Sequence, residues 1–116
     1  MCHAPSLKTR PDYPLAVLAG IDAPIYSDVL LHDMGDSLAD GVAKIDGEAT
    51  SRDWRTTPLI GLRFDKELMH DGRAKTVGDA IRAHAGPGSE ANESVQIFDS
   101  MSPADQKALL DFVGAL

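Results

Sequence analysis

The chain has 116 residues, of which 43% are hydrophobic and 25% charged, and its formal net charge at pH 7 is −7. This length and composition are typical of one small globular domain, which we assign to residues 1–116. The acidic balance argues against nucleic-acid binding, because phosphate contacts need clustered Lys and Arg. No apolar run approaches the ~20 residues that a membrane span requires, and no export signal is recognisable.

The first three residues, Met1-Cys2-His3, match the end of a C-x-x-C-H motif. In that motif the cysteine thiols bind the vinyl groups of haem covalently, and the histidine ligates the iron. A Cys-His pair alone is a weak signal, because chance produces it readily. Since the first cysteine of the motif is absent, at most one thioether bond can form. With one cysteine in the chain, disulfide pairing gives no indication of the redox compartment.

Irregular structure is predicted for the first third of the chain. Residues 4–26 contain four prolines, each of which lacks an N–H donor and disfavours a helical predecessor. A short apolar run at 29–31 then leads into His32-Asp33-Met34-Gly35, and a loop rich in Gly and Asp extends to about residue 53.

Three helices are predicted in the remainder. Thr76 is expected to cap the first, which Gly86-Pro87 ends, and Ser89 to cap a second that runs to about Asp99. Ser102 is expected to cap the third, because Pro103 follows it at the first helical position. Few segments alternate apolar and polar residues, so strands should be rare. The predicted fold class is therefore mostly α, with long irregular loops.

Spacing places two further groups of side chains on helix faces. In the last helix the positions i, i+3, i+4 and i+7 form one apolar stripe that should be buried; these are Leu109, Phe112, Val113 and Leu116. In the first helix His84 shares an apolar face with Val77 and Ile81. A histidine there is either bonded to a main-chain carbonyl in the core or ligates a metal.

The other candidate ligands have more ordinary interpretations. His70 precedes a turn and is expected to stabilise a loop, and Met34 is either an axial haem ligand or a packing residue. The dipeptides His32-Asp33 and His70-Asp71 also occur in metal-dependent phosphohydrolases of the HD type. Those enzymes need several further histidines on long helices, whereas here both dipeptides lie next to Gly in turn contexts.

Five blocks of the sequence span nearly all of it: SDVLLHDMG at 27–35, LADG at 38–41, WRTTPLIGL at 54–62, MHDGRAKT at 69–76 and the closing segment at 102–116. In this order they resemble the di-haem c-type oxidoreductases often described as thiol oxidoreductases. That family is in turn similar to bacterial di-haem cytochrome c peroxidases.

The resemblance implies a C-terminal cytochrome c-like helical domain that begins within its haem motif and lacks its first helix. Its distal iron ligand, typically methionine, is expected in the helix after the H-D-G block, where this chain has His84. The implied site has His3 and His84 as axial iron ligands, Cys2 as the covalent anchor of haem c, and Arg55 paired with a haem propionate. Trp54 is expected to donate its indole N–H to the same propionate.

With the four porphyrin nitrogens, two axial imidazoles would fill all six coordination positions of the iron, so this domain suits electron transfer better than peroxide chemistry. The resemblance therefore implies an electron-transfer fragment of a periplasmic di-haem peroxidase-like oxidoreductase, whose export signal lies upstream. Its expected partners are the N-terminal haem domain of the same protein, missing here, and a redox partner protein. Fold and haem by themselves do not determine the substrate of the parent enzyme.

The alternative is a haem-free, acidic binding or structural remnant of such a domain. Without the preceding helix, the stripe that contains Leu109, Phe112 and Leu116 would lack a partner surface. We therefore expect the chain alone to be marginally stable and to bind haem weakly or not at all.

Overall fold

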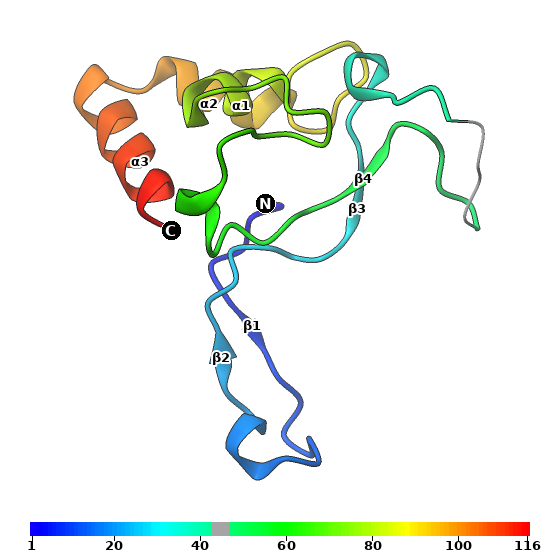
Figure 1. The fold of residues 1–116 in the computed structure, drawn as a ribbon, viewed down its shortest axis with the longest axis vertical. Helices are drawn as coiled ribbons and strands as arrows, with labels where there is room; N and C mark the ends of the chain where they lie inside the picture. Colours follow the sequence, from blue (N-terminus) through cyan, green and yellow to red (C-terminus); the bar gives the residue numbers. More distant parts are fainter. Residues whose placement is uncertain (43–46) are drawn as a thin grey trace. The chain divides into compact units, whose positions relative to one another are not determined.

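The computed structural model of the chain describes residues 1–42 and 47–116 (Figure 1). These residues form two compact units. The first unit contains Met1–Leu30 and Arg55–Ile60, and the second contains Leu31–Trp54 and Gly61–Leu116. The predicted site residues are therefore divided between two bodies that each have their own internal contacts.

The first unit is built on a hairpin, drawn in blue in Figure 1. Its strands β1 (Leu7–Lys8) and β2 (Asp22–Ala23) pair in antiparallel register, and a 3-10 turn, η1 (Ala16–Leu18), lies between them. The Thr9 hydroxyl accepts a hydrogen bond from the Ile21 amide at 3.0 Å and extends the pairing by one residue. The strands stay short because the prolines that flank them have no N–H for a longer ladder.

The second unit contains most of a second sheet, in which β3 (Leu31–Asp33) pairs antiparallel with β4 (Asp53–Arg55). Directly after β3, Met34 forms an antiparallel bridge with Ser89, far along the chain. A 3-10 turn, η2 (Asp36–Leu38), follows. This extended segment thus contacts two distant parts of the sequence.

A small hydrophobic core lies where that segment ends. Met34, Leu38 and Ala91 form its buried centre, and the half-buried Trp54 and Met69 pack against it. Leu38 is 2% exposed, and its carbonyl accepts a hydrogen bond from the Trp54 indole N–H at 3.0 Å. The core therefore joins η2 and β4 to the start of α2.

Two of the three predicted helix starts are confirmed. Helix α1 (Val77–Ala83) follows Thr76, whose hydroxyl accepts a hydrogen bond from the Asp79 amide at 3.1 Å. Helix α3 (Pro103–Ala115) follows Ser102, which accepts the corresponding bond at 3.2 Å. Each hydroxyl satisfies one of the N–H groups that the first helical turn leaves without a partner.

The predicted cap of the second helix is wrong. Helix α2 (Asn92–Ser100) begins three residues after Ser89, and its N-cap position is Ala91, which makes no side-chain cap. The Ser89 hydroxyl donates instead to the His84 carbonyl at 2.6 Å and accepts a hydrogen bond from the Ala91 amide at 3.1 Å. Ser89 therefore joins the end of α1 to the start of α2.

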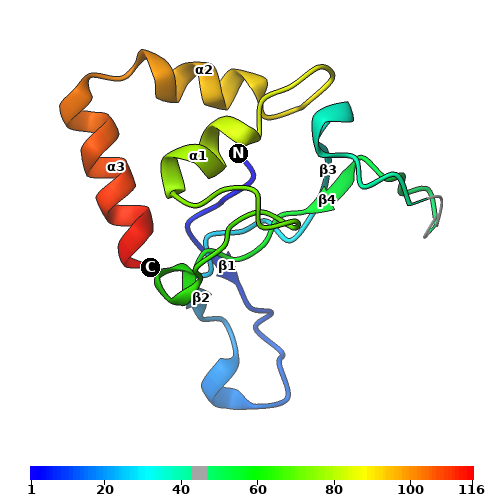
Figure 2. The same cartoon turned by 45° about the horizontal axis from the view of Figure 1, so that its top comes forward.

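The closing helix is less buried than its apolar stripe predicts. Figure 2 shows α3 running at a steep angle to α2, and α3 packs against α1 and the 3-10 turn η3 (Leu62–Phe64). No residue of α3 is buried, and Phe112 is 48% exposed. The apolar stripe of α3 is therefore only partly covered by α1 and η3, and much of its surface is exposed to water.

The prediction of a mostly α fold is wrong. The described residues contain three α-helices and two small antiparallel sheets, so the chain is mixed α and β. Strands of two or three residues are too short to show the alternation by which a strand is recognised. Within the described residues, no helix has the length and apolar character needed to cross a membrane.

Candidate functional site

Cys2 and His3 lie in the first unit, on a segment held by main-chain contacts. Both side chains are half-buried, and the Cys2 thiol is not part of a disulfide. The Cys2 carbonyl accepts a hydrogen bond from the Asp28 amide at 2.8 Å. The His3 Nδ1 atom lies 2.9 Å from the Tyr26 carbonyl oxygen.

This last contact determines the tautomer of His3. A carbonyl oxygen only accepts hydrogen bonds, so Nδ1 carries the proton and donates it to Tyr26. In the neutral imidazole the lone pair is then on Nε2. A histidine that ligates a metal usually has its other ring N–H bonded in this way to a carbonyl or a carboxylate.

His84 occupies the C-cap position of α1 in the second unit and has the same arrangement. Its Nδ1 lies 2.6 Å from the Ala80 carbonyl oxygen, so that Nδ1 donates and Nε2 has the lone pair. Its own carbonyl accepts the hydrogen bond from Ser89. Within residues 1–42 and 47–116, the His84 side chain makes no other hydrogen bond or ion pair.

The remaining two histidines are engaged in other contacts. His32 Nδ1 donates to the Glu90 carboxylate at 2.9 Å, and the His70 ring stacks on Trp54 with a centroid separation of 3.8 Å. The hydrogen bond from His32 and a second from the Asp33 amide hold the pKa of Glu90 below its usual range. Both contacts stabilise the fold of the second unit.

The two His-Asp dipeptides do not form a metal site of the HD type in the second unit. The Asp33 carboxylate accepts a hydrogen bond from Arg52 at 2.9 Å, and Asp71 is bound by Arg73 at 2.6 Å. Partial burial raises the pKa of Asp71, but the Arg73 hydrogen bonds outweigh this and leave the pKa lowered. Carboxylates that are neutralised by arginine are poor ligands for a divalent cation.

Three further predicted residues are placed as follows. Met34 is 7% exposed and belongs to the hydrophobic core, which supports its interpretation as a packing residue. The prediction for Trp54 is wrong, because the Leu38 carbonyl takes up its indole N–H. Arg55 is exposed at the end of β4, and its guanidinium has no hydrogen-bond or ion-pair partner within the described residues.

The predicted ligand set is thus divided between the units. Cys2, His3 and Arg55 belong to the first unit, and His84 belongs to the second. In each histidine, a hydrogen bond inside its own unit places the proton on Nδ1 and leaves Nε2 as the coordinating nitrogen. The pairing of the two histidines on one iron stays a prediction.

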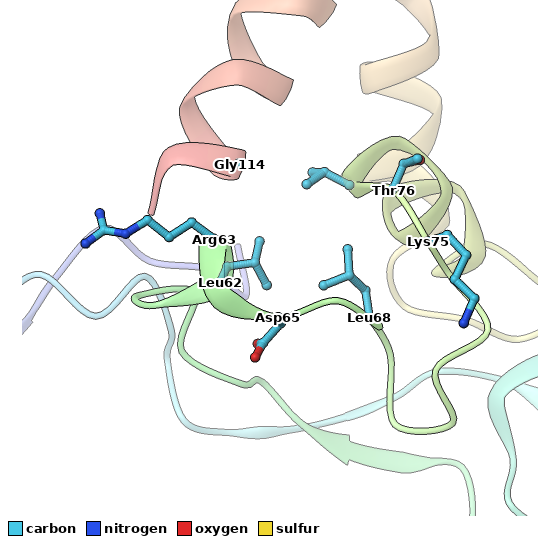
Figure 3. A pocket seen from close by; sticks show the side chains of 8 residues that line it. Leu62, Arg63, Asp65, Leu68, Lys75, Thr76 and Gly114 are labelled. Atoms are coloured by element: carbon cyan, nitrogen blue, oxygen red, sulfur yellow. The ribbon is translucent and has the colours of Figure 1, made fainter.

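A hollow of about 230 Å³ in the second unit contains none of these residues (Figure 3). Its two basic residues are already occupied, since Lys75 pairs with Glu67 and Arg63 donates to the Ala115 carbonyl. The residues that line the hollow are Leu62, Arg63, Asp65, Leu68, Lys75, Thr76, Val77 and Gly114. The hollow is therefore not the predicted cofactor site.

The chemistry of the predicted ligand set fits haem c. Two imidazoles with fixed Nδ1 protons offer nitrogen ligands of the kind that haem iron takes. Cys2 directly precedes His3 in the sequence, as the second cysteine precedes the histidine in the covalent attachment motif. Arg55, which has no ion pair within residues 1–42 and 47–116, suits a propionate.

Sequence reasoning missed the tertiary hydrogen bonds of two serines. Ser27 and Ser89 are both buried and have hydroxyls with two hydrogen bonds each. Ser27 opens the SDVLLHDMG block, but its hydroxyl bonds to a residue 29 positions away. No local pattern indicates such a contact.

Comparison with known proteins identifies the family. A family-level sequence model, described as "Di-haem oxidoreductase, putative peroxidase", matches residues 1–116. No curated protein and no solved structure matches the chain. The match covers the whole chain and confirms the resemblance found in the sequence blocks. The chain belongs to the di-haem oxidoreductase family.

Proposed function

We propose that this chain is a c-type haem-binding, electron-transfer domain of a periplasmic di-haem oxidoreductase. Cys2 forms the thioether bond to the porphyrin, and the Nε2 atoms of His3 and His84 are the axial iron ligands. Arg55 pairs with a haem propionate. The other haem belongs to a further domain of the same protein, and a redox partner protein exchanges electrons with this one.

One observation carries the proposal. Both candidate ligands donate Nδ1–H to a main-chain carbonyl, His3 to Tyr26 at 2.9 Å and His84 to Ala80 at 2.6 Å. This bond selects the tautomer in which Nε2 coordinates, and it restrains the ring against rotation. His32 also donates Nδ1–H, to the Glu90 carboxylate, and His70 lies stacked on Trp54. His3 and His84 are therefore preferred because the Cys-His motif and the family pattern also point to them.

The chain's own residues determine what such a site does. Haem supplies a one-electron iron couple when it is bound. Two imidazole ligands hold both axial positions, which excludes substrate from the iron and favours passage of electrons. The net charge of −7 favours docking on a redox partner with a basic surface.

The test is covalent haem attachment in a host that matures c-type cytochromes. The full chain is exported in two versions, one as it stands and one with a cysteine added three positions before Cys2. We expect the extended version to retain haem after denaturing extraction, because it restores both thioether bonds. The chain as it stands and the extended version with Cys2→Ala each have one cysteine of the motif, so both should retain little.

The result also decides between the haem domain and the haem-free remnant. A folded, extended chain that emerges without haem contradicts the proposal and supports the haem-free alternative. Arg55→Gln is a secondary test, expected to weaken retention of non-covalent haem by up to about fivefold, as for an exposed ion pair. Arg63→Gln is its control, since that guanidinium already bonds the Ala115 carbonyl.

A further inference from the structure

Ser27 is the most deeply buried polar residue described, with 0% exposure. Its hydroxyl donates to the Thr56 carbonyl at 2.7 Å and accepts a hydrogen bond from the Val29 amide at 2.9 Å. All three residues lie in the first unit. The hydroxyl thus joins two segments that are far apart in the sequence.

The residues around Ser27 have an unusual backbone. Tyr26 has φ 52° and Val29 has φ 56°, and neither is glycine. A side chain disfavours this left-handed region, most strongly a β-branched one such as valine. Such conformations persist when surrounding contacts over-determine them. The bond from the Val29 amide to Ser27 is one of those contacts.

The same loop holds the haem-attachment segment. Tyr26 presents its carbonyl to His3 Nδ1 at 2.9 Å, and the Asp28 amide donates to the Cys2 carbonyl at 2.8 Å. Ser27 lies between these two contact points in the sequence. The direction of the Tyr26 carbonyl therefore depends on the loop that the Ser27 hydroxyl ties to Thr56.

We infer that Ser27 is a positioning residue for the His3 ligand. Its hydroxyl fixes the loop of residues 26–29 so that the Tyr26 carbonyl receives the Nδ1 proton of His3. That bond keeps the lone pair of the imidazole on Nε2. The role of His3 as an iron ligand rests on the proposed function, but the control of its tautomer by Ser27 does not.

The experiment measures the His3 tautomer in the full, haem-free chain by long-range ¹H–¹⁵N NMR. The pH is held at about 8, well above the ordinary pKa of histidine of about 6.5, so that the ring is neutral. In the native chain we expect the Nδ1–H form to dominate. In Ser27→Ala we expect its share to fall several-fold, because the Tyr26 carbonyl is no longer held in place.

Ser89→Ala is the matched control. Ser89 is also buried, at 7% exposure, and its hydroxyl also makes two main-chain hydrogen bonds, but within the second unit. Its loss should lower stability and leave the His3 tautomer unchanged. If Ser27→Ala does not fold, the double variant Ser27→Ala/Val29→Gly removes the hydroxyl and relieves the strained residue at 29.

The outcomes separate this inference from the proposed function. A folded chain that lacks the Ser27 hydroxyl and keeps the Nδ1–H form of His3 overturns the inference. An equal tautomer change in Ser89→Ala overturns it as well. Failure of the folded version with the added cysteine to take up haem overturns the proposed function and leaves the tautomer result standing.

Discussion

The Nδ1 atom of His84 lies 2.6 Å from the carbonyl oxygen of Ala80, one helical turn earlier. Helix α1 ends here, and carbonyls in the last turn of a helix have no partner within it. The imidazole satisfies one of them, as basic side chains near helix C-termini often do. The same bond keeps the proton on Nδ1 and the lone pair on Nε2, so one contact both satisfies a carbonyl at the end of α1 and leaves Nε2 as the coordinating nitrogen.

The identity of the ligand at position 84 should determine the reduction potential of the haem-loaded chain. We expect His84→Met to raise the potential by on the order of 0.1 V, because thioether sulfur favours ferrous iron and axial ligands tune potentials over about 0.8 V. A spectroelectrochemical titration measures it. Met34→Leu is the control and should leave the potential unchanged; a shift there would make Met34 the ligand.

Gly35 should be intolerant of any side chain. It has φ 72°, and a Cβ there would collide with the Pro87 carbonyl and lie 2.9 Å from the Ser89 amide. We expect Gly35→Ala to lower the free energy of unfolding by at least ~3 kcal/mol, from backbone strain and overpacking together.

Urea denaturation measures this loss, and Gly20→Ala is the matched control. Gly20 has φ 66°, and no atom of the described residues lies within 4 Å of its Cβ position. Gly20→Ala should lower the free energy of unfolding by about 1–2 kcal/mol, which is the cost of holding alanine in the left-handed conformation. Equal losses at the two glycines would show that the contact with Pro87 and Ser89 does not constrain the fold.

Relief of strain at Val29 should stabilise the chain. Val29 is 44% exposed and has φ 56°. We expect Val29→Gly to raise the free energy of unfolding by roughly 0.5–1 kcal/mol, the relief of strain less the entropy that glycine adds to the unfolded chain. Val17→Gly should give no gain, since Val17 is exposed without a positive φ. Destabilisation by Val29→Gly would refute the strain at this position.

The His32–Glu90 contact should make stability depend on pH in the acid range. The pKa of Glu90 is lowered from 4.5 in the folded chain, first by the hydrogen bond from His32 and then by that from the Asp33 amide. Its contribution to stability is therefore complete above about pH 4.5 and is lost as the pH falls through the lower, folded value.

Glu90→Gln should accordingly reduce stability at pH 7 and reduce it much less at pH 3. Urea denaturation at both values measures the difference. Glu93→Gln, an exposed substitution in α2, is the control for removal of one carboxylate. A constant deficit of Glu90→Gln at both pH values would contradict the linkage.

Local sequence signals predict the starts of two helices, α1 and α3. Thr76 and Ser102 start helices because the residues that complete each cap lie three positions away. Ser89 has the same residue type, but its hydroxyl bonds the His84 carbonyl instead, which only the meeting of α1 and α2 determines. The fold class was mispredicted because the strands are two or three residues long and pair with distant segments.

For the candidate site too, the sequence predicts the ligands but not the residues that hold them. The adjacent Cys2 and His3 indicate a haem motif, and the apolar face of α1 indicates His84. The Tyr26 carbonyl that holds His3 is 23 residues away, and Glu90, which holds His32, is 58 residues away. Contacts at such separations arise from tertiary packing and leave no periodic trace.

The most direct test of the axial pair is the electron paramagnetic resonance spectrum of the ferric, haem-loaded chain, recorded for the native sequence and for His84→Ala. The account predicts a low-spin signal typical of two imidazole ligands in the native chain and a high-spin signal in His84→Ala, with His70→Ala unchanged from native. A low-spin spectrum that survives His84→Ala, or a native spectrum that is already high-spin, would contradict it.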